Sequence, residues 1–201
     1  TFRHWMQKLD YIAEVHCGKS ILSIMFDDLK SNLHTFDRLL YTNPAIFMVE
    51  YSLTQTLIEI GIKPDYIIGA SLGEYVSLAV AGNCSYEGIL KFVIDLAQAL
   101  ENEYNGDGAM LAVLANKKVL QSGNLLSNCE IAAHNQENHF ILSGKAKHIL
   151  DAEKYLKTNN YISQLLPVSY AFHSSFIDEL EDLFKKKFKK IICTNTRNNI
   201  V

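Results

Sequence analysis

One short segment of the sequence has residue types and spacing that are typical of a serine nucleophile. Residues 69–73 read Gly-Ala-Ser-Leu-Gly, between the apolar run 66–68 and a helix-forming stretch. In a nucleophile elbow the glycines leave room for a sharp strand-to-helix turn that exposes the serine hydroxyl. We therefore predict that Ser71 is a nucleophile and that the Leu72 backbone N–H is half of an oxyanion hole. The alternative is a glycine-bounded turn with an ordinary helix-capping serine.

A serine hydroxyl is a weak nucleophile at its ordinary pKa and needs a neighbouring base. Among the seven histidines, His173 is the best candidate, because it follows the apolar loop 168–172 and precedes two serines that can cap the next helix. A histidine held at a loop-to-helix junction is well placed to act as a general base. The spacing of residues alone does not exclude the other histidines as the base.

The elements that must position these residues follow an α/β pattern. The first 40 residues alternate apolar and charged side chains at helical spacing, and Thr42-Asn43-Pro44 has the form of a helix start. That helix is predicted to end at Gly61, and the run 66–68 reads as a buried strand. Further helices are predicted over 72–81 and 85–104. One stripe of the first long helix is apolar: Ile46, Val49, Leu53, Leu57 and Ile60.

After residue 106 the pattern becomes strand, helix, strand, strand, helix, strand, which is the ferredoxin-like order. The predicted ranges are 109–115, 117–122, 130–133, 139–143, 146–157 and 161–167. We therefore expect a ferredoxin-like subdomain at 107–167, inserted into a core formed by 1–106 and 168–201. A helix over 175–188 and a last strand over 190–193 complete that core.

Composition excludes several classes of protein. The 201 residues are 48% hydrophobic and 20% charged, as in a globular chain, and the net charge of −3 points to neither nucleic acid nor a membrane surface. No apolar run is long enough to span a bilayer. The four cysteines are far apart and form no CxxC pair, so neither a zinc site nor a redox motif is predicted and a cytoplasmic location is expected. We also expect no bound metal.

The elbow and several other segments resemble one enzyme family. Residues 69–74 are similar to the GHSLGE motif of malonyl-CoA:acyl-carrier-protein transacylases, which include the acyltransferase domains of polyketide synthases. Further matches follow in the right order: 43–47 with the QPA helix, 108–110 with the start of the small subdomain, 132–135 and 143–144 with an AxxN…SG stretch, and 171–174 with AFHS.

This resemblance implies an α/β-hydrolase-like core with a parallel sheet and a ferredoxin-like insertion. It also implies a Ser71–His173 dyad that forms an acyl-serine intermediate, with Asn135 and the position before the serine, Ala70, near the substrate. The implied partner is an acyl carrier protein, whose phosphopantetheine carries the acyl group, and acyl-CoA is the other implied substrate. The protein itself then needs no cofactor.

The sequence departs from the family in three respects. Family members carry an arginine that pairs with the malonyl carboxylate, and we expect Gln98 to occupy that position here. The only arginines of the chain are Arg3, Arg38 and Arg197. Ala70 replaces the histidine of the motif. Members also start with a GQGSQ loop and continue beyond the last strand, so we expect a chain cut from something longer, with the core incomplete at both ends.

In lacking the arginine and having Ala70 in place of the histidine, the sequence resembles the acyl-hydrolase branch of the family, which acts in trans in polyketide assembly lines. The leading hypothesis is therefore a serine enzyme that hydrolyses acyl groups from acyl carrier proteins. One alternative is a malonyl- or acyl-CoA:acyl-carrier-protein transacylase. The other is an inactive fragment that docks a carrier protein without catalysis.

Overall fold

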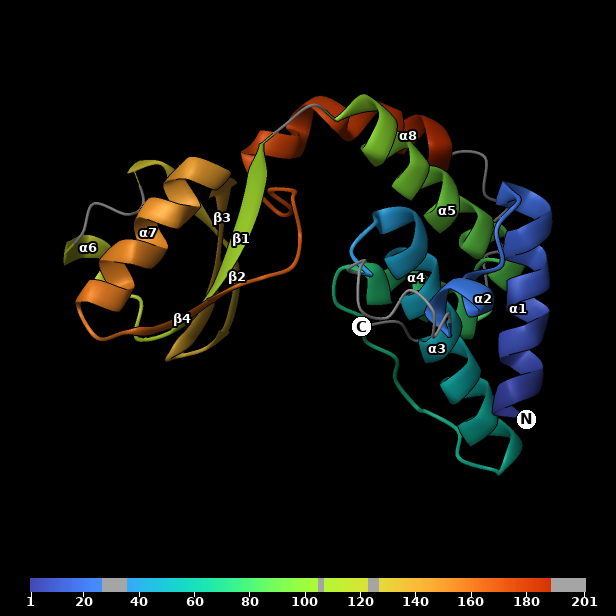
Figure 1. Ribbon diagram of the computed structural model, residues 1–201. Coiled ribbons are helices and arrows are strands. Elements are labelled where there is room, and N and C mark those ends of the chain that lie inside the picture. The colour runs from blue at the N-terminus through green and yellow to red at the C-terminus, as the bar shows by residue number, and fades with distance from the viewer. Residues whose placement is uncertain (27–35, 105–106, 123–126, 189–201) are drawn as a thin grey trace. The chain divides into compact units, whose positions relative to one another are not determined.

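The structure is a computed structural model that describes residues 1–26, 36–104, 107–122 and 127–188. The chain divides into two compact units. Figure 1 shows the chain coloured from blue at the N-terminus to red at the C-terminus. The first unit consists of Thr1–Glu103 and Leu183–Val201, and the second of Tyr104–Asp182. The segment 107–167, which the sequence predicts as an inserted subdomain, falls within the second unit. That unit also contains 168–182 and therefore His173.

The first unit is built from helices that pack around one long helix. The helix α3 contacts α1, α4 and α5. The bounds are α1 Phe2–Cys17, α2 Ile21–Met25, α3 Leu39–Glu59, α4 Leu72–Val80 and α5 Tyr86–Glu103. Large apolar side chains with no exposed surface fill the space between them: Leu9, Phe47, Met48, Ile89, Leu90 and Ile94. The predicted helices are confirmed, and the Ser85 hydroxyl accepts a hydrogen bond from the Gly88 N–H as the predicted cap of α5.

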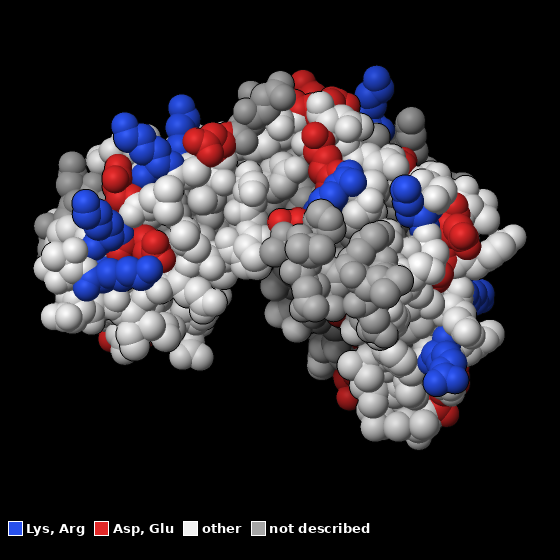
Figure 2. All heavy atoms as spheres, viewed as in Figure 1, with Lys and Arg blue, Asp and Glu red and all other residues white. Residues whose placement is uncertain are grey.

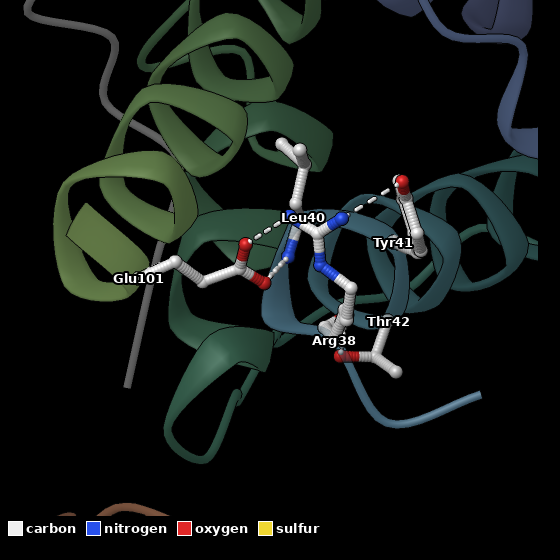
Figure 3. Close-up of polar contacts among 5 residues, drawn as sticks. All are labelled: Arg38, Leu40, Tyr41, Thr42 and Glu101. Carbon is white, nitrogen blue, oxygen red and sulfur yellow. Dashed lines mark hydrogen bonds and ion pairs between the residues drawn. The ribbon is translucent and has the colours of Figure 1, made fainter. Parts of the chain in front are cut away.

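The start of α3 differs from the sequence prediction. The Thr42-Asn43-Pro44 signature predicted the first turn there, but α3 begins at Leu39 and holds Pro44 inside it. The cause is Glu101 of α5, whose carboxylate accepts a hydrogen bond from the Leu40 N–H at 3.0 Å and pairs with the Arg38 guanidinium at 2.6 Å (Figure 3). A carboxylate from another helix thus satisfies a donor that the sequence of α3 cannot.

The buried strand predicted at 66–68 is not formed. Ile67 makes only an isolated bridge, and the side chains of Tyr66 and Ile68 are 68% and 80% exposed. A strand needs a paired neighbour, and no sheet borders this run among the described residues. The apolar stripe of α3 is also largely exposed, because α3 buries the face that carries Phe47 and Met48 instead.

The second unit contains a four-stranded antiparallel sheet of order β2-β3-β1-β4. Its elements are β1 Gly108–Leu114, α6 Val119–Ser122, β2 Cys129–Gln136, β3 His139–Lys145, α7 Ala146–Thr158 and β4 Ile162–Leu165. The helix α7 covers the sheet, with Leu111, Phe140, Leu142 and Ile149 fully buried between them. This order of elements confirms the predicted ferredoxin-like arrangement, and the α/β class of the chain is confirmed with it.

The segment after the sheet forms two helices where the sequence predicts one. A 3-10 helix, η2, spans Ser175–Leu180, and α8 spans Glu181–Phe188. The strand predicted over 190–193 lies outside the described residues. In the described ranges, no helix is both long and apolar enough to cross a membrane. Figure 2 shows basic side chains interspersed with acidic ones on the face of each unit that it displays.

Candidate functional site

Ser71 occupies a strained turn at the start of α4. Its φ is 53° and its ψ is −119°, a conformation that L-residues rarely adopt and that functional turns retain. Its hydroxyl does not cap α4, and the side chain is exposed. A tight turn directly before a helix, with an exposed hydroxyl, suits the predicted nucleophile, and the hydroxyl lacks the cap hydrogen bond of an ordinary capping serine.

Gly69 makes this turn possible. A Cβ on Gly69 would overlap the carbonyl group of Gly73 and the amide nitrogen of Glu74. The turn is closed by two backbone hydrogen bonds of 3.0 Å, in which Gly73 donates to Ala70 and Glu74 donates to Ser71. Only a residue without a side chain therefore fits at position 69.

The Leu72 N–H is the first N–H of α4, and no described residue accepts a hydrogen bond from it. A helix N-terminus carries a partial positive charge, and its first donors need acceptors from outside the helix. This N–H is next to the Ser71 hydroxyl in the chain. The geometry therefore suits the predicted role of Leu72 as an oxyanion donor.

A carboxylate that sequence reasoning missed lies beside the elbow. Glu50 projects from α3, and its Oε2 is the nearest atom that a Cβ on Gly73 would meet, at 3.9 Å. Glu50 is exposed, but partial desolvation of its carboxyl raises the pKa of that group above its ordinary value. Nothing in the local sequence around Glu50 indicates this proximity, because α3 and α4 meet only through the fold.

Gln98 lies on α5, the helix that follows the elbow helix, and is half-buried. Arg38, the arginine closest in sequence to the elbow, is committed elsewhere. Its guanidinium pairs with Glu101, donates to the Tyr41 hydroxyl at 3.2 Å and lies over the Tyr41 ring (Figure 3). No arginine of the sequence lies on α5, so a bidentate partner for a carboxylate is missing from that helix.

His173 belongs to the second unit and lies in a tightly turned loop. Its φ is 57°, and the residue is exposed. The buried Ser174 hydroxyl donates to the Ala171 carbonyl at 2.6 Å and closes the turn around His173. A Cβ on Gly108 would overlap the backbone of residues 170–171, so this strand residue lies directly against the loop. The loop is thus held from both ends.

Asn135 lies near the exposed end of β2, in the same unit as His173. Its Nδ2 is 3.5 Å from Nδ1 of His139, and its side chain is exposed. The predicted site residues therefore fall into two groups, one in each unit. Ala70, Ser71, Leu72 and Gln98 belong to the first unit, and Asn135 and His173 to the second. Over the described ranges, no three His, Cys, Asp or Glu side chains gather as a metal site would require.

Comparison with known proteins places the chain in a family. Residues 1–200 match the acyl transferase domain family. The chain is 41% identical over 187 residues to the polyketide biosynthesis acyltransferase homolog BaeD of Bacillus velezensis, covering 92% of this chain and 57% of that protein. It is 39% identical over 196 residues to the homolog PksD of Bacillus subtilis, covering 94% and 60%.

The fold matches solved structures as well. The malonyl CoA-acyl carrier protein transacylase of Burkholderia pseudomallei superposes with a TM-score of 0.85 at 26% identity, covering 97% of this chain and 67% of that structure. The chain spans about three fifths of the length of the two Bacillus relatives. A match over almost every residue, joined to an elbow with the geometry described above, gives one conclusion: the chain belongs to the acyl transferase domain family.

Proposed function

We propose that the protein removes acyl groups from thioesters on acyl carrier proteins, through an acyl-Ser71 intermediate and with His173 as the base. The observation that carries this proposal is the backbone of Ser71, with a φ of 53° and a hydroxyl that does not cap α4. A serine in an ordinary cap gains nothing from such strain, whereas a nucleophile must be exposed at the turn.

Acylation uses the groups described above. The Ser71 Oγ attacks the thioester carbonyl carbon while His173 takes the hydroxyl proton. The Leu72 N–H donates to the developing oxyanion. The C–S bond then breaks, and the thiolate of the phosphopantetheine leaves with the proton from His173. The products of this half-reaction are acyl-Ser71 and a free carrier-protein thiol.

Deacylation decides between hydrolysis and transfer. His173 removes a proton from water, the resulting hydroxide attacks the acyl carbon, and the C–O bond to Ser71 breaks. The Ser71 oxygen recovers the proton, and a free carboxylic acid is released. If a carrier-protein thiol attacks instead of water, the same intermediate yields a new thioester.

The lack of an arginine on α5 favours neutral acyl groups as the substrates for hydrolysis. A buried malonyl carboxylate without a cationic partner costs several kcal/mol. The helix α5 carries Gln98 and no arginine, and Arg38 is paired with Glu101. A neutral acyl chain such as acetyl needs no such partner. The similarity to the two Bacillus polyketide biosynthesis acyltransferase homologs supports a place in polyketide biosynthesis.

A transacylase is the second candidate, and the structural match to the Burkholderia malonyl transacylase favours it. A carrier-protein docking module without catalysis is the third. It would leave the conformation of Ser71 without a function, so it has the least support.

A product assay separates the three candidates. The protein is mixed with acetyl- and malonyl-carrier protein and with malonyl-CoA plus free carrier protein, and free acid and new thioester are quantified. We expect acetate release to be faster than malonate release or malonyl transfer. Efficient malonyl transfer with negligible hydrolysis would contradict the hydrolase, and inactivity toward every thioester would support the docking module.

Ser71→Ala is the control for background hydrolysis in that assay, because it removes the nucleophile while leaving the backbone able to turn. A Gln98→Arg variant tests the selectivity. We expect it to increase malonate loading of Ser71 relative to acetate loading, since a guanidinium is the strongest partner for a carboxylate.

A further inference from the structure

A carboxylate outside the predicted site reaches the loop that carries His173. Glu130 lies on β2, opposite Ser143 of β3. Its Oε2 accepts a hydrogen bond from the Ser175 N–H at 3.0 Å, and its Oε1 accepts one from the Ser175 hydroxyl. Ser175 is two residues after His173. All of these residues lie in the second unit, so the contact is internal to one compact body.

The Glu130 carboxylate supplies a hydrogen-bond acceptor that the loop itself does not provide for the start of η2. Ser175 is the first residue of η2, and the N–H groups at a helix start need acceptors from outside the helix. The preceding Ser174 is the N-cap residue, but its hydroxyl donates to Ala171 instead of accepting from η2. Hydrogen bonds to an ionised carboxylate are among the strongest in proteins. The two bonds from Ser175 also hold the pKa of Glu130 below its ordinary value.

The conformation of His173 needs such an anchor. A non-glycine residue in the left-handed region is strained and persists only where the surrounding structure fixes it. Before His173 the chain is fixed by the close approach of Gly108 to residues 170–171 and by the stacking of Tyr170 on Phe172. After His173 the chain is tied to β2 at Ser175, through Glu130.

We infer that Glu130 is a positioning residue, whose carboxylate holds the Ser174–Ser175 turn and thereby the backbone that presents the His173 imidazole. The inference rests on the proposed function, in which His173 is the base. Glu130 acts through its two hydrogen bonds from Ser175, so its removal changes where the base lies.

The test compares three variants of the full chain. Glu130→Ala removes both acceptors, and Glu130→Gln keeps an oxygen for the Ser175 N–H and an amide for the Ser175 hydroxyl. Glu137→Ala is the matched control, because Glu137 is an exposed carboxylate in the β2–β3 turn of the same sheet. Amide hydrogen exchange at residues 173–175 reports on the turn, and kcat and KM for acetyl-carrier-protein hydrolysis report on the base.

We expect Glu130→Ala to speed exchange at Ser175 about tenfold or more, and to lower kcat about 10- to 100-fold with KM nearly unchanged. Glu130→Gln should restore most of kcat, and Glu137→Ala should behave as the wild type. Unchanged exchange at Ser175 in Glu130→Ala overturns the inference, and so does faster exchange with an unchanged kcat.

Failure of the proposed function gives a different result. A wild-type protein that hydrolyses no thioester shows that the function is wrong. In that case the exchange at residues 173–175 still decides whether Glu130 holds the turn. If Glu130→Ala does not fold, Ser175→Ala replaces it, because it removes the hydroxyl that donates to Glu130. Faster exchange at residues 173–175 is then the supporting result, and unchanged exchange is the contradicting one.

Discussion

Gly69 is the most constrained single residue of the elbow. A side chain there would overlap backbone atoms of Gly73 and Glu74, which cannot move without opening the turn. The second glycine of the motif is under no such constraint, because a Cβ on Gly73 would meet nothing nearer than the Glu50 carboxylate at 3.9 Å. Of the two glycines in the Gly-x-Ser-x-Gly pattern, Gly69 is therefore required to avoid a steric clash, and Gly73 is not.

We predict that Gly69→Ala destabilises the fold by about 1–3 kcal/mol or more, because it forces the backbone apart, and that it abolishes labelling of Ser71 by a fluorophosphonate. Gly73→Ala is the matched control. It should be neutral or slightly stabilising, by up to about 1 kcal/mol, since alanine favours the helix. Chemical denaturation and gel-based labelling measure both effects. Equal losses in the two variants would contradict the assignment of the constraint to Gly69.

Glu130 gives a prediction in pH. The hydrogen bonds from Ser175 hold the pKa of Glu130 below its ordinary value of 4.5. A depressed pKa in the folded state adds stability above the unfolded pKa, and that stability is lost as the pH falls through the folded pKa. The difference in unfolding free energy between wild type and Glu130→Ala should therefore be largest near neutral pH and shrink below about pH 4.5. A difference that stays constant with pH would show that the charge of Glu130 is irrelevant.

The residues of the site differ in how far the sequence could predict them. Ser71 and His173 lie in local patterns, a glycine-bounded turn and a loop-to-helix junction, so their types and neighbours pointed to them. Glu50 and Glu130 have no such pattern. Glu130 meets Ser175 across 45 residues of sequence, and only the fold brings the two together. The roles of Ser71 and His173 remain predictions until they are measured.

At the scale of elements, α3 shows how one helix sets the start of another. The N–H groups of Tyr41 and Thr42 donate to the Arg38 carbonyl, whereas the Leu40 N–H donates to Glu101 of α5 (Figure 3). The pattern at residues 42–44 predicted the later start because it can only report on local signals. The single carboxylate therefore adds residues to the helix that carries Phe47, Met48 and Glu50.

We predict that Glu101→Ala frays the first turn of α3, so that the helix begins near residues 42–44 as its own sequence favours. Amide exchange at Leu40 should accelerate, and stability should fall by about 1–3 kcal/mol, because a donor and the Arg38 charge lose their partner. Glu103→Ala is the control, as Glu103 lies exposed in the last turn of the same helix. Unchanged exchange at Leu40 would show that Glu101 does not define the start.

The sequence predicts a strand correctly where another strand lies beside it and pairs with it. The four strands of the second unit each alternate with turns or helices, so the ferredoxin-like order could be read from the sequence and their pairing followed. The apolar run 66–68 carries the same local signal, yet it forms only a bridge at Ile67, because no paired strand borders it in the described part of the chain. Apolar content predicts a strand only if a partner strand lies beside it.

For the whole molecule, the main feature is the division into two units with separate cores. A buried cluster of the second unit runs from Leu111 to Leu156 and includes residues of the sheet and of α7. The first unit has its own buried set between α1, α3 and α5. Ser71 belongs to the first unit and His173 to the second.

We predict that Leu142→Ala, a substitution at a fully buried position of β3, lowers the stability of the second unit by about 2–5 kcal/mol. Exchange should accelerate across β1 to β4 and much less across α3 and α5, because those helices pack in the other core. Leu150→Ala, at a 51% exposed position of α7, is the control and should change stability by about 0.5 kcal/mol or less. Uniform acceleration across both units would contradict separate cores.

An acyl-serine intermediate made by Ser71 with His173 as base can be detected by mass spectrometry of the protein quenched soon after mixing with acetyl-carrier protein. We predict one acetyl group on the peptide that contains Ser71 in the wild type and none in Ser71→Ala. We also predict acylation that is slower by about 10²–10⁴-fold in His173→Ala. An adduct on another residue, or acylation of His173→Ala at the wild-type rate, would contradict it.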